Sequence, residues 1–324
     1  KWAVGAKPAL LGQKLTRKKS VDPLTPLEHC LIDVQIGIFP TQQLLQLSNA
    51  GSFNAFAGNG TFKYEVCPVP GINRQFHGKF IRQVQVCIER LCALLANVLS
   101  LEPKSLWNVA TDGWRPQPQV PTLSGGLQVR MIPHPPMRVT MYVVGDPATG
   151  QALVLDPGAR PDTIRQVVRE AGWQVVAYLI THCDADHVGA LADVHVAMPA
   201  PVWVHADARH LLPEVSSGDV MTITDDGPLT VGPFDTRVLQ TPGHARGHVS
   251  YALRDGVLVG DTIFAGSIGG TLLGPEYYAG QLAAIRAKLL TCPDDTKLLA
   301  GHGPPTTVGE EKRHNPFLAA ASRL

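Results

Sequence analysis

The chain has 324 residues, with 28 Lys and Arg against 27 Asp and Glu, and a formal net charge of +1. This length can bury a sizeable core in one large or two modest domains. The near-neutral charge gives no electrostatic reason to expect nucleic acid or an anionic membrane as a partner. No apolar run approaches the roughly 20 residues that a membrane-spanning helix requires.

The cysteines and the N-terminus bear on the compartment. Six cysteines without any CxxC pair favour free, mostly buried thiols over disulfides, which predicts a reducing, cytoplasmic location. Six basic residues precede the first acid, Asp22, but no apolar stretch typical of a secretory signal follows them. We interpret this segment as a solvated basic arm.

The first 115 residues form an N-terminal extension of unassigned role. Residues 48–76 are rich in Gly, Asn, Phe and Pro and are interpreted as loop. Residues 78–100 place apolar side chains at helical spacing and predict one helix that packs on another part of the protein. The Pro-rich residues 116–126 predict a connector to the following domain.

From residue 127 to residue 324, short β-rich runs alternate with helical runs, which predicts an α/β layered domain. The predicted strands are residues 127–132, 139–145, 152–156, 174–180, 201–205, 237–241, 249–253, 256–260 and 297–300. The predicted helices are residues 161–171 and about 279–290.

The segment THCDADHVGA, residues 181–190, carries the strongest chemical signal. It follows a predicted buried strand and offers four side chains that can bind a metal, namely His182, Asp184, Asp186 and His187. Imidazole nitrogen and carboxylate oxygen suit zinc, iron and manganese. The alternative is a solvated turn in which a carboxylate caps a helix.

Three later segments argue against that alternative, because each repeats one pattern. An apolar strand is followed by a glycine-containing bend and then by a single His or Asp. The segments are TPGHARGH with His244, LVGDTIF with Asp261 and LLAGHGPP with His302. The sequence therefore predicts one metal centre built from four loops.

In motif order, the chain resembles the metallo-β-lactamase-fold hydrolases. THCDADHVG, TPGHARGH, GDTIF and GHG follow one another as in that superfamily, and FAGSIG (264–269) and residues 293–317 resemble short glyoxalase II-like bacterial hydrolases. The resemblance covers residues 127–320 and implies a four-layer αββα sandwich, here with a partly helical N-terminal extension.

The resemblance also implies a ligand set for two divalent metal ions. The first ion would be bound by His182, Asp184 and His244. The second would be bound by Asp186, His187 and His302. Asp261 would bridge the ions, and Asp156 would support the site from behind. His248 matches a position that is not a ligand.

Two departures from the family pattern affect the expected chemistry. The family usually has His where this chain has Asp184, and a carboxylate there moves the metal preference from zinc, the first expectation, towards manganese or iron. Gly270-Thr271-Leu272 replaces the commonly found Arg-Thr-Asp. The chain also stops soon after Pro316, without the C-terminal helical domain that holds glutathione in full-length glyoxalase II.

These features predict a metal-dependent hydrolase that attacks with a metal-bound hydroxide. The expected substrate is a small molecule with a thioester or related ester-like bond, and Asp186 and Asp261 are the expected catalytic carboxylates. Alternatives are a mononuclear iron persulfide dioxygenase using His182, His244 and Asp261, a phosphodiesterase, and a non-catalytic metal-binding module. A homo-oligomer is left open.

Overall fold

The structure is a computed structural model that describes residues 53–58, 61–66, 74–111, 113–116, 122–271 and 274–318. The chain divides into two compact units, residues 1–74 and residues 75–324. The basic N-terminal arm and residues 117–121 of the Pro-rich connector lie outside the described residues. No helix among the described residues is long and apolar enough to cross a membrane.

The first unit contains an antiparallel hairpin of β1 (Phe53–Gly58) and β2 (Thr61–Val66). The interpretation of residues 48–76 as loop is therefore wrong over these two strands. The high Gly and Asn content concealed them, although Asn59-Gly60 between the strands is the sequence most typical of a two-residue hairpin connection.

The helix expected at 78–100 is confirmed as α2 (Arg74–Leu99), which begins four residues earlier. It is followed by α3 (Pro103–Ala110), where the Glu102 side chain accepts a hydrogen bond from the Ser105 backbone N–H and caps the helix. This segment is joined to α8 (Val308–His314), because the Trp114 ring stacks on His314 with centroids 4.9 Å apart and its indole N–H donates to Glu310.

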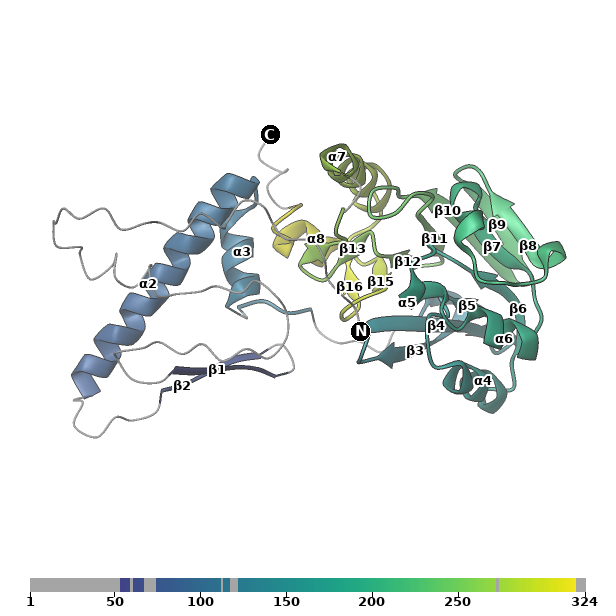
Figure 1. Cartoon of the computed structure of the whole chain (residues 1–324), viewed down its shortest axis with the longest axis horizontal. Coiled ribbons are helices and arrows are strands. Elements are labelled where there is room, and N and C mark those ends of the chain that lie inside the picture. Colours follow the sequence, from purple (N-terminus) through teal and green to yellow (C-terminus); the bar gives the residue numbers. More distant parts are fainter. Residues whose placement is uncertain are drawn as a thin grey trace. The chain divides into compact units, whose positions relative to one another are not determined.

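Two six-stranded sheets form the body of the second unit (Figure 1). The order in the first sheet is β3 (Gln128–His134), β4 (Val139–Asp146), β5 (Gln151–Leu155), β6 (Gln174–Leu179), β7 (Val202–His205) and β8 (Val220–Ile223). The order in the second is β16 (Thr306–Thr307), β15 (Lys297–Ala300), β12 (Gly256–Gly260), β11 (Val249–Leu253), β10 (Phe234–Gln240) and β9 (Gly227–Val231). A separate hairpin is made by β13 (Ile263–Phe264) and β14 (Ser267–Ile268).

The parallel pairs explain where the candidate ligands gather. In the first sheet β5, β6, β7 and β8 pair in parallel, and in the second β12 and β15 do. Carboxyl ends of parallel strands meet at one edge of a sheet, so loops that follow them lie together. The turns after β6, β12 and β15 carry His182, Asp261 and His302.

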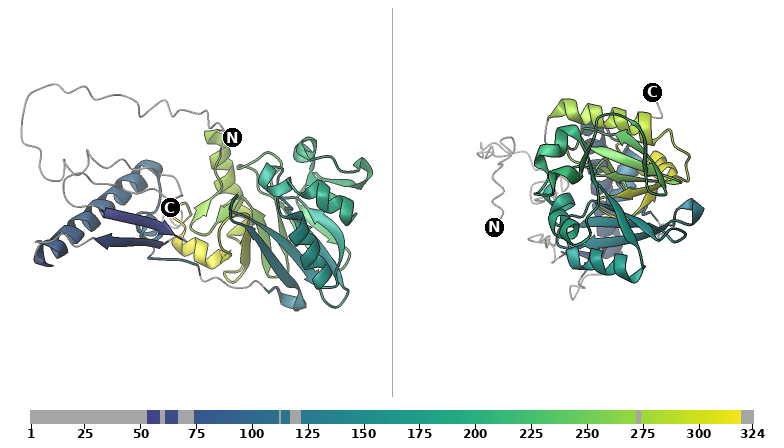
Figure 2. Two further views of the ribbon diagram at one scale, coloured as in Figure 1. Left: turned by 60° about the horizontal axis from the view of Figure 1, so that its bottom comes forward. Right: turned by 90° about the vertical axis from the view of Figure 1, so that its right-hand side faces the viewer.

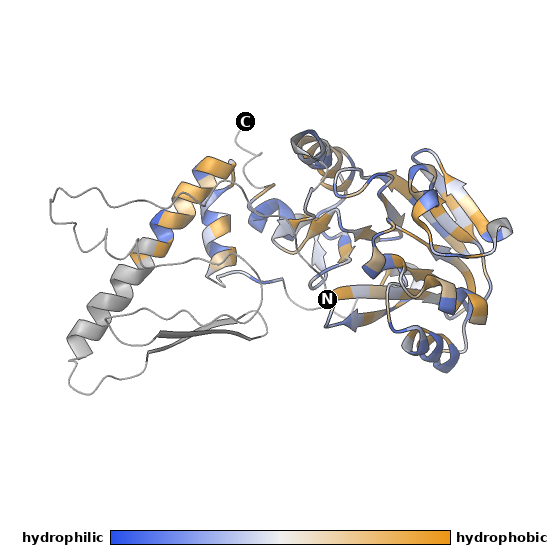
Figure 3. Ribbon diagram, in the orientation of Figure 1, coloured by the Kyte–Doolittle hydropathy of each residue, from blue (hydrophilic) through white to orange (hydrophobic). Residues whose placement is uncertain are grey.

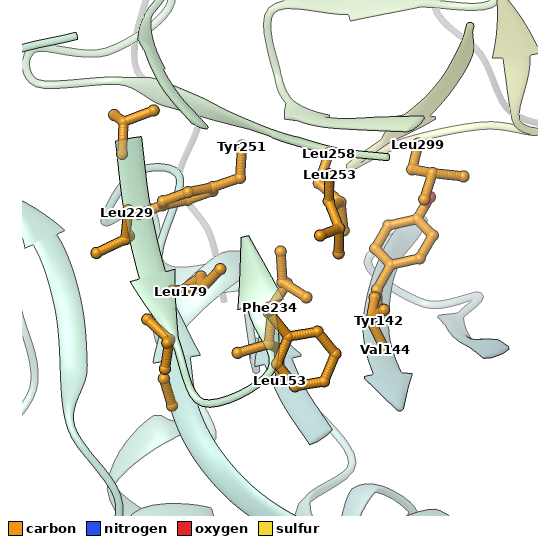
Figure 4. Packing of buried hydrophobic residues seen from close by; sticks show 14 of the residues in the cluster. Tyr142, Val144, Leu153, Leu179, Leu229, Phe234, Tyr251, Leu253, Leu258 and Leu299 are labelled. Atoms are coloured by element: carbon orange, nitrogen blue, oxygen red, sulfur yellow. The ribbon is translucent and has the colours of Figure 1, made fainter. Parts of the chain in front are cut away.

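A buried apolar layer holds the two sheets face to face (Figure 4). It includes Leu153 and Leu179 from the first sheet and Phe234, Tyr251 and Leu258 from the second, all at most 2% exposed. The central strands, such as β4, β5 and β12, are buried along nearly their whole length, as expected for sheets that are covered on both sides. Figure 3 shows this as orange strands inside bluer helices.

Helices cover the outer face of each sheet (Figure 2). On the first sheet these are α4 (Pro161–Glu170), α5 (Ala185–Val188) and α6 (Leu191–Ala197), through side chains such as Ile164 and Leu191. On the second they are α7 (Pro275–Ala284), its π-helical continuation Ile285–Leu289, and α8. The predicted αββα sandwich is confirmed.

Candidate metal centre

All seven side chains predicted as metal ligands lie around one point between the carboxyl ends of the two sheets. β6 leads through Thr181 into the turn with His182 and Asp184, and α5 then presents Asp186 and His187. His244, Asp261 and His302 follow β10, β12 and β15. Each loop therefore delivers its ligands directly after a buried strand, which fixes the position of the backbone.

One group of ligand atoms is formed by His182, His244 and Asp261, whose ligating atoms lie within 4.8 Å of one another. The two imidazole rings have centroids 5.0 Å apart, and His244 Nε2 is 3.6 Å from Asp261 Oδ2. Asp184 Oδ2 lies 3.4 Å from His244 Nε2 and 3.8 Å from His182 Nε2. Its side chain is 54% exposed, so it stands at the open side of this group.

A second group is formed by Asp186, His187 and His302, again within 4.8 Å of one another. Asp186 Oδ2 is 3.4 Å from His302 Nε2 and 4.0 Å from His187 Nε2. Asp261 faces this group too, with Oδ2 3.2 Å from His302 Nε2 and Oδ1 3.3 Å from His187 Nε2. Its carboxylate therefore stands between the two groups, which is the geometry of a bridging ligand.

The four histidines are held so that Nε2 points inward. His244 Nδ1 is 2.7 Å from the Gly270 carbonyl, and His302 Nδ1 is 2.8 Å from the Arg138 carbonyl. Because a carbonyl only accepts, Nδ1 must carry the proton, and in the neutral ring Nε2 keeps its lone pair for a metal. Supporting hydrogen bonds of this kind orient metal-binding histidines.

Asp156 orients the His187 ring in the same way. Its Oδ2 is 3.1 Å from His187 Nδ1 and accepts a hydrogen bond from the Thr181 hydroxyl, while Oδ1 accepts one from the Thr181 backbone N–H. Asp156 also lies close enough to His182 and His187 to complete a third ligand set. Because both of its oxygens accept hydrogen bonds, the predicted supporting role of Asp156 agrees with its position.

Several inward-facing atoms form no hydrogen bond within the described part of the chain, and this tests whether a metal fits. The buried polar atoms without a hydrogen bond include Nε2 of His182, His187 and His244 and Oδ1 of Asp261. Burying such groups without partners is costly. A cluster of unpaired imidazole nitrogens around a carboxylate is the donor set that zinc, iron or manganese completes.

Comparison with known proteins decides the family. The family model of the metallo-beta-lactamase superfamily matches residues 134–302. The chain is 38% identical over 206 residues to the "Probable metallo-hydrolase YqgX" of Bacillus subtilis, covering 58% of this chain and 96% of that relative. The chain belongs to the metallo-β-lactamase superfamily, a family of metal-dependent hydrolases.

Two further relatives support the assignment. The "Hydroxyacylglutathione hydrolase GloC" of Haemophilus influenzae is 30% identical over 188 residues, which is 53% of this chain and 89% of that protein. The solved BLEG-1 B3 metallo-beta-lactamase superposes with a TM-score of 0.54 at 33% identity, over 59% of this chain and 99% of that chain. The superfamily and the hydrolase class predicted from the motifs are thus confirmed, whereas the roles of individual ligands stay predictions.

The candidate ligand histidines of the metallo-β-lactamase domain have shifted pKa values, because they are buried beside carboxylates and beside one another. Although burial opposes protonation, hydrogen bonds to Asp186 and Asp261 raise the pKa of His302 to about 10. Burial also opposes protonation of His187, but contacts with Asp156 and Asp261 outweigh it and raise the pKa of this residue. The pKa of His182 is lowered by burial and by the neighbouring histidines. Because a metal needs the imidazole lone pair, metal binding must displace protons from this cluster.

His248 supports the metallo-β-lactamase centre without facing it. Its Nε2 accepts a hydrogen bond from the Asp261 backbone N–H at 3.1 Å, and its Nδ1 lies 3.0 Å from the Thr241 hydroxyl. Burial lowers the pKa of His248 to about 3, so the ring is neutral and can accept that bond. Since Nε2 is occupied, His248 is not placed to bind the metal, and it instead fixes the backbone of Asp261.

Glycines allow the loops to approach one another. A Cβ on Gly301 would lie 2.3 Å from Asp261 Oδ1 and 2.6 Å from His187 Cε1. A Cβ on Gly158 would lie 1.5 Å from the Asp186 carbonyl oxygen. The glycine before His302 in GHG is therefore required by the packing of the ligands and not by the turn alone.

Two side chains beside the ligands have other partners. Cys183 packs in the cluster under α4 and α6, and burial, together with Asp156 and Asp184, raises its pKa to about 12. The thiol is therefore neutral, as expected for a packing residue. Arg246 is exposed and donates a hydrogen bond to the Tyr277 hydroxyl at 3.2 Å, which links the His244 loop to α7.

Proposed function

We propose that this chain is a thioester hydrolase with two divalent metal ions, zinc being the first expectation. The proposal depends on one observation: Asp261 completes the group of His182 and His244, and its carboxylate also faces the group of Asp186, His187 and His302. In this proposal His182, Asp184 and His244 hold one ion, and Asp186, His187 and His302 hold the other.

Two cations held by these residues would supply a nucleophile, because metal coordination lowers the pKa of water from about 15.7 to roughly 7. The residues of the chain do the positioning. Asp261 sets the spacing of the two groups, and His248 fixes its backbone. Asp186 holds a carboxylate oxygen 3.4 Å from His302 Nε2, where it would help to hold the second ion.

The choice of a thioester follows from the leaving group. A simple thiol has a pKa of about 8.5, so a thiolate departs without a strong proton donor. Cleavage of this bond therefore needs no separate general acid. The relative named hydroxyacylglutathione hydrolase supports the same class of substrate.

The test is hydrolysis of a hydroxyacyl glutathione thioester by the full chain after loading with zinc, manganese or iron. We expect thioester cleavage with two bound ions, and a loss of at least 100-fold in kcat/KM on Asp261→Asn. Asp235→Asn, an exposed carboxylate on β10, is the matched control and should retain full activity. Loaded protein that cleaves no thioester would overturn the proposal.

A mononuclear iron dioxygenase is the second candidate, because His182, His244 and Asp261 form a complete two-His, one-carboxylate set. The two candidates differ in metal count and in oxygen use. One iron per chain with oxygen consumption on a persulfide would favour the dioxygenase. Two ions per chain with anaerobic turnover would favour the hydrolase.

A further inference from the structure

A groove of about 580 Å³ opens beside the metal centre. Its volume lies within the range of roughly 300–1,000 Å³ that small-molecule sites occupy. Three segments line it, namely the hairpin between β3 and β4, the β13–β14 hairpin and the loop after β15 (Figure 1). His302 is the candidate ligand among its lining residues, so the groove reaches the second ligand group directly.

The walls of the groove are mainly apolar. Pro133, Pro135 and Val139 line one side, and Phe264 and Ala265 line the other. The Phe264 ring meets the His302 ring edge-on, with centroids 5.6 Å apart. A substrate that reacts beside His302 would therefore extend along an apolar, partly open groove.

Hydrogen bonds join two of the three segments that line the groove. The Thr140 backbone N–H donates to the Gly301 carbonyl at 2.8 Å, and Val139 forms a β-bridge with His302. On the outer side, Arg160 donates to the Pro133 carbonyl at 2.8 Å. The hairpin between β3 and β4 is thus tied to the loop that carries His302.

We infer that this groove holds the acyl chain of the substrate and that it selects long apolar acyl chains over short ones. This inference rests on the proposed thioester hydrolysis. A thioester has two ends, and cellular thiol carriers are polar and must leave after cleavage. The apolar slot therefore suits the acyl end, while the thiol end points towards the open side of the centre at Asp184.

The composition of the groove also suits the product. Its lining residues include His134 and Arg138 but no Asp or Glu. A carboxylate formed at the metal centre is therefore not repelled by the groove. The free acid should bind there too, which makes binding measurable without turnover.

The first experiment compares acetyl and octanoyl thioesters of the same thiol with the zinc-loaded full chain. Burial of one methylene is worth about a fourfold gain in binding, so we expect kcat/KM for the octanoyl thioester to exceed that for the acetyl thioester at least tenfold. Ala265→Phe fills the groove and should reduce this ratio at least tenfold. Val196→Phe, on α6 at a side chain 82% exposed, adds the same ring elsewhere and should leave the ratio unchanged.

The second experiment measures binding of octanoate and acetate by calorimetry, again with zinc-loaded protein. We expect octanoate to bind at least tenfold more tightly than acetate, and Ala265→Phe, or the milder Ala265→Leu, to remove the difference. Selective octanoate binding without thioester cleavage would keep the groove assignment and overturn the proposed function. Equal binding of both acids, or a difference unaffected by either variant, would overturn the assignment.

Discussion

Asp261 Oδ1 lies 3.3 Å from His187 Nε2, while the other oxygen of the same carboxylate lies 3.6 Å from His244 Nε2. One residue thus contacts both candidate ligand groups. The side chain of Asp184, by contrast, lies near His182 and His244 of the first group and is 54% exposed.

This difference predicts unequal effects of removing the two carboxylates. Asp261→Ala should lose both metal ions, because neither group keeps its shared ligand, whereas Asp184→Ala should retain at least one ion per chain. Elemental analysis of protein purified without chelator measures both. Equal losses from the two variants would contradict the bridging position of Asp261.

Gly301→Ala should weaken metal binding at least tenfold without changing any ligand. The added methyl group would have to displace Asp261 or His187, because its place lies 2.3 Å from the Asp261 carboxylate. Gly280→Ala on α7 is the control, since a Cβ there meets nothing within 4 Å and alanine favours a helix. Competition with a chromogenic chelator measures the affinities, and unchanged zinc affinity in Gly301→Ala would refute the packing argument.

Zinc binding should release protons and should weaken as the pH falls. The pKa of His302 in the metal-free protein is about 10, so at pH 8 this imidazole is protonated and zinc must displace its proton. Calorimetric titration at pH 8 in buffers of different ionisation enthalpy counts the protons released. His302→Ala should release about one proton fewer, and an identical count would show that His302 is neutral before binding.

Glu311 should make folding stability fall as the pH rises. Burial raises its pKa to about 7 despite hydrogen bonds from Gly266, Thr306 and Asn315. The unfolded carboxyl, with a pKa near 4.3, loses its proton first. The folded state therefore keeps the full benefit of protonation below about pH 4 and loses it as the pH rises towards 7.

The size of this effect can be isolated with Glu311→Gln, which cannot titrate. Between pH 4 and pH 8 the free energy of unfolding of the wild type should fall by about 3 kcal/mol relative to the variant. Urea denaturation of both proteins at each pH gives the difference and cancels titrations that they share. Parallel pH profiles would mean that the pKa of Glu311 is not raised in the folded protein.

The sequence predicted the ligand loops well, because an apolar strand followed by a glycine bend is a local pattern. It missed β8 and β9, whose burial is interrupted by exposed residues such as Met221 and Thr230. It also missed α3, α6 and α8. Short elements of this kind are stabilised by contacts with distant segments, for which a local pattern gives no signal.

The supports of the site were harder to predict than its ligands. Asp156 was expected from the family resemblance, but the carbonyls of Gly270 and Arg138 that orient His244 and His302 could not be read from side-chain types. Glu311 lies far in sequence from Gly266, which it holds. Its signal was only a pair of adjacent glutamates, which usually marks an exposed helix.

The divided origin of the ligands has a consequence for folding. The first sheet supplies the turn with His182 and His187, and the second supplies His244, Asp261 and His302. Each of the two groups that face Asp261 therefore draws ligands from both halves. Metal occupancy would therefore report on the packing of the two sheets, and an ion that binds only the packed state would strengthen their association by mass action. Loss of the ion would weaken the packing of the two sheets against each other before either sheet unfolded.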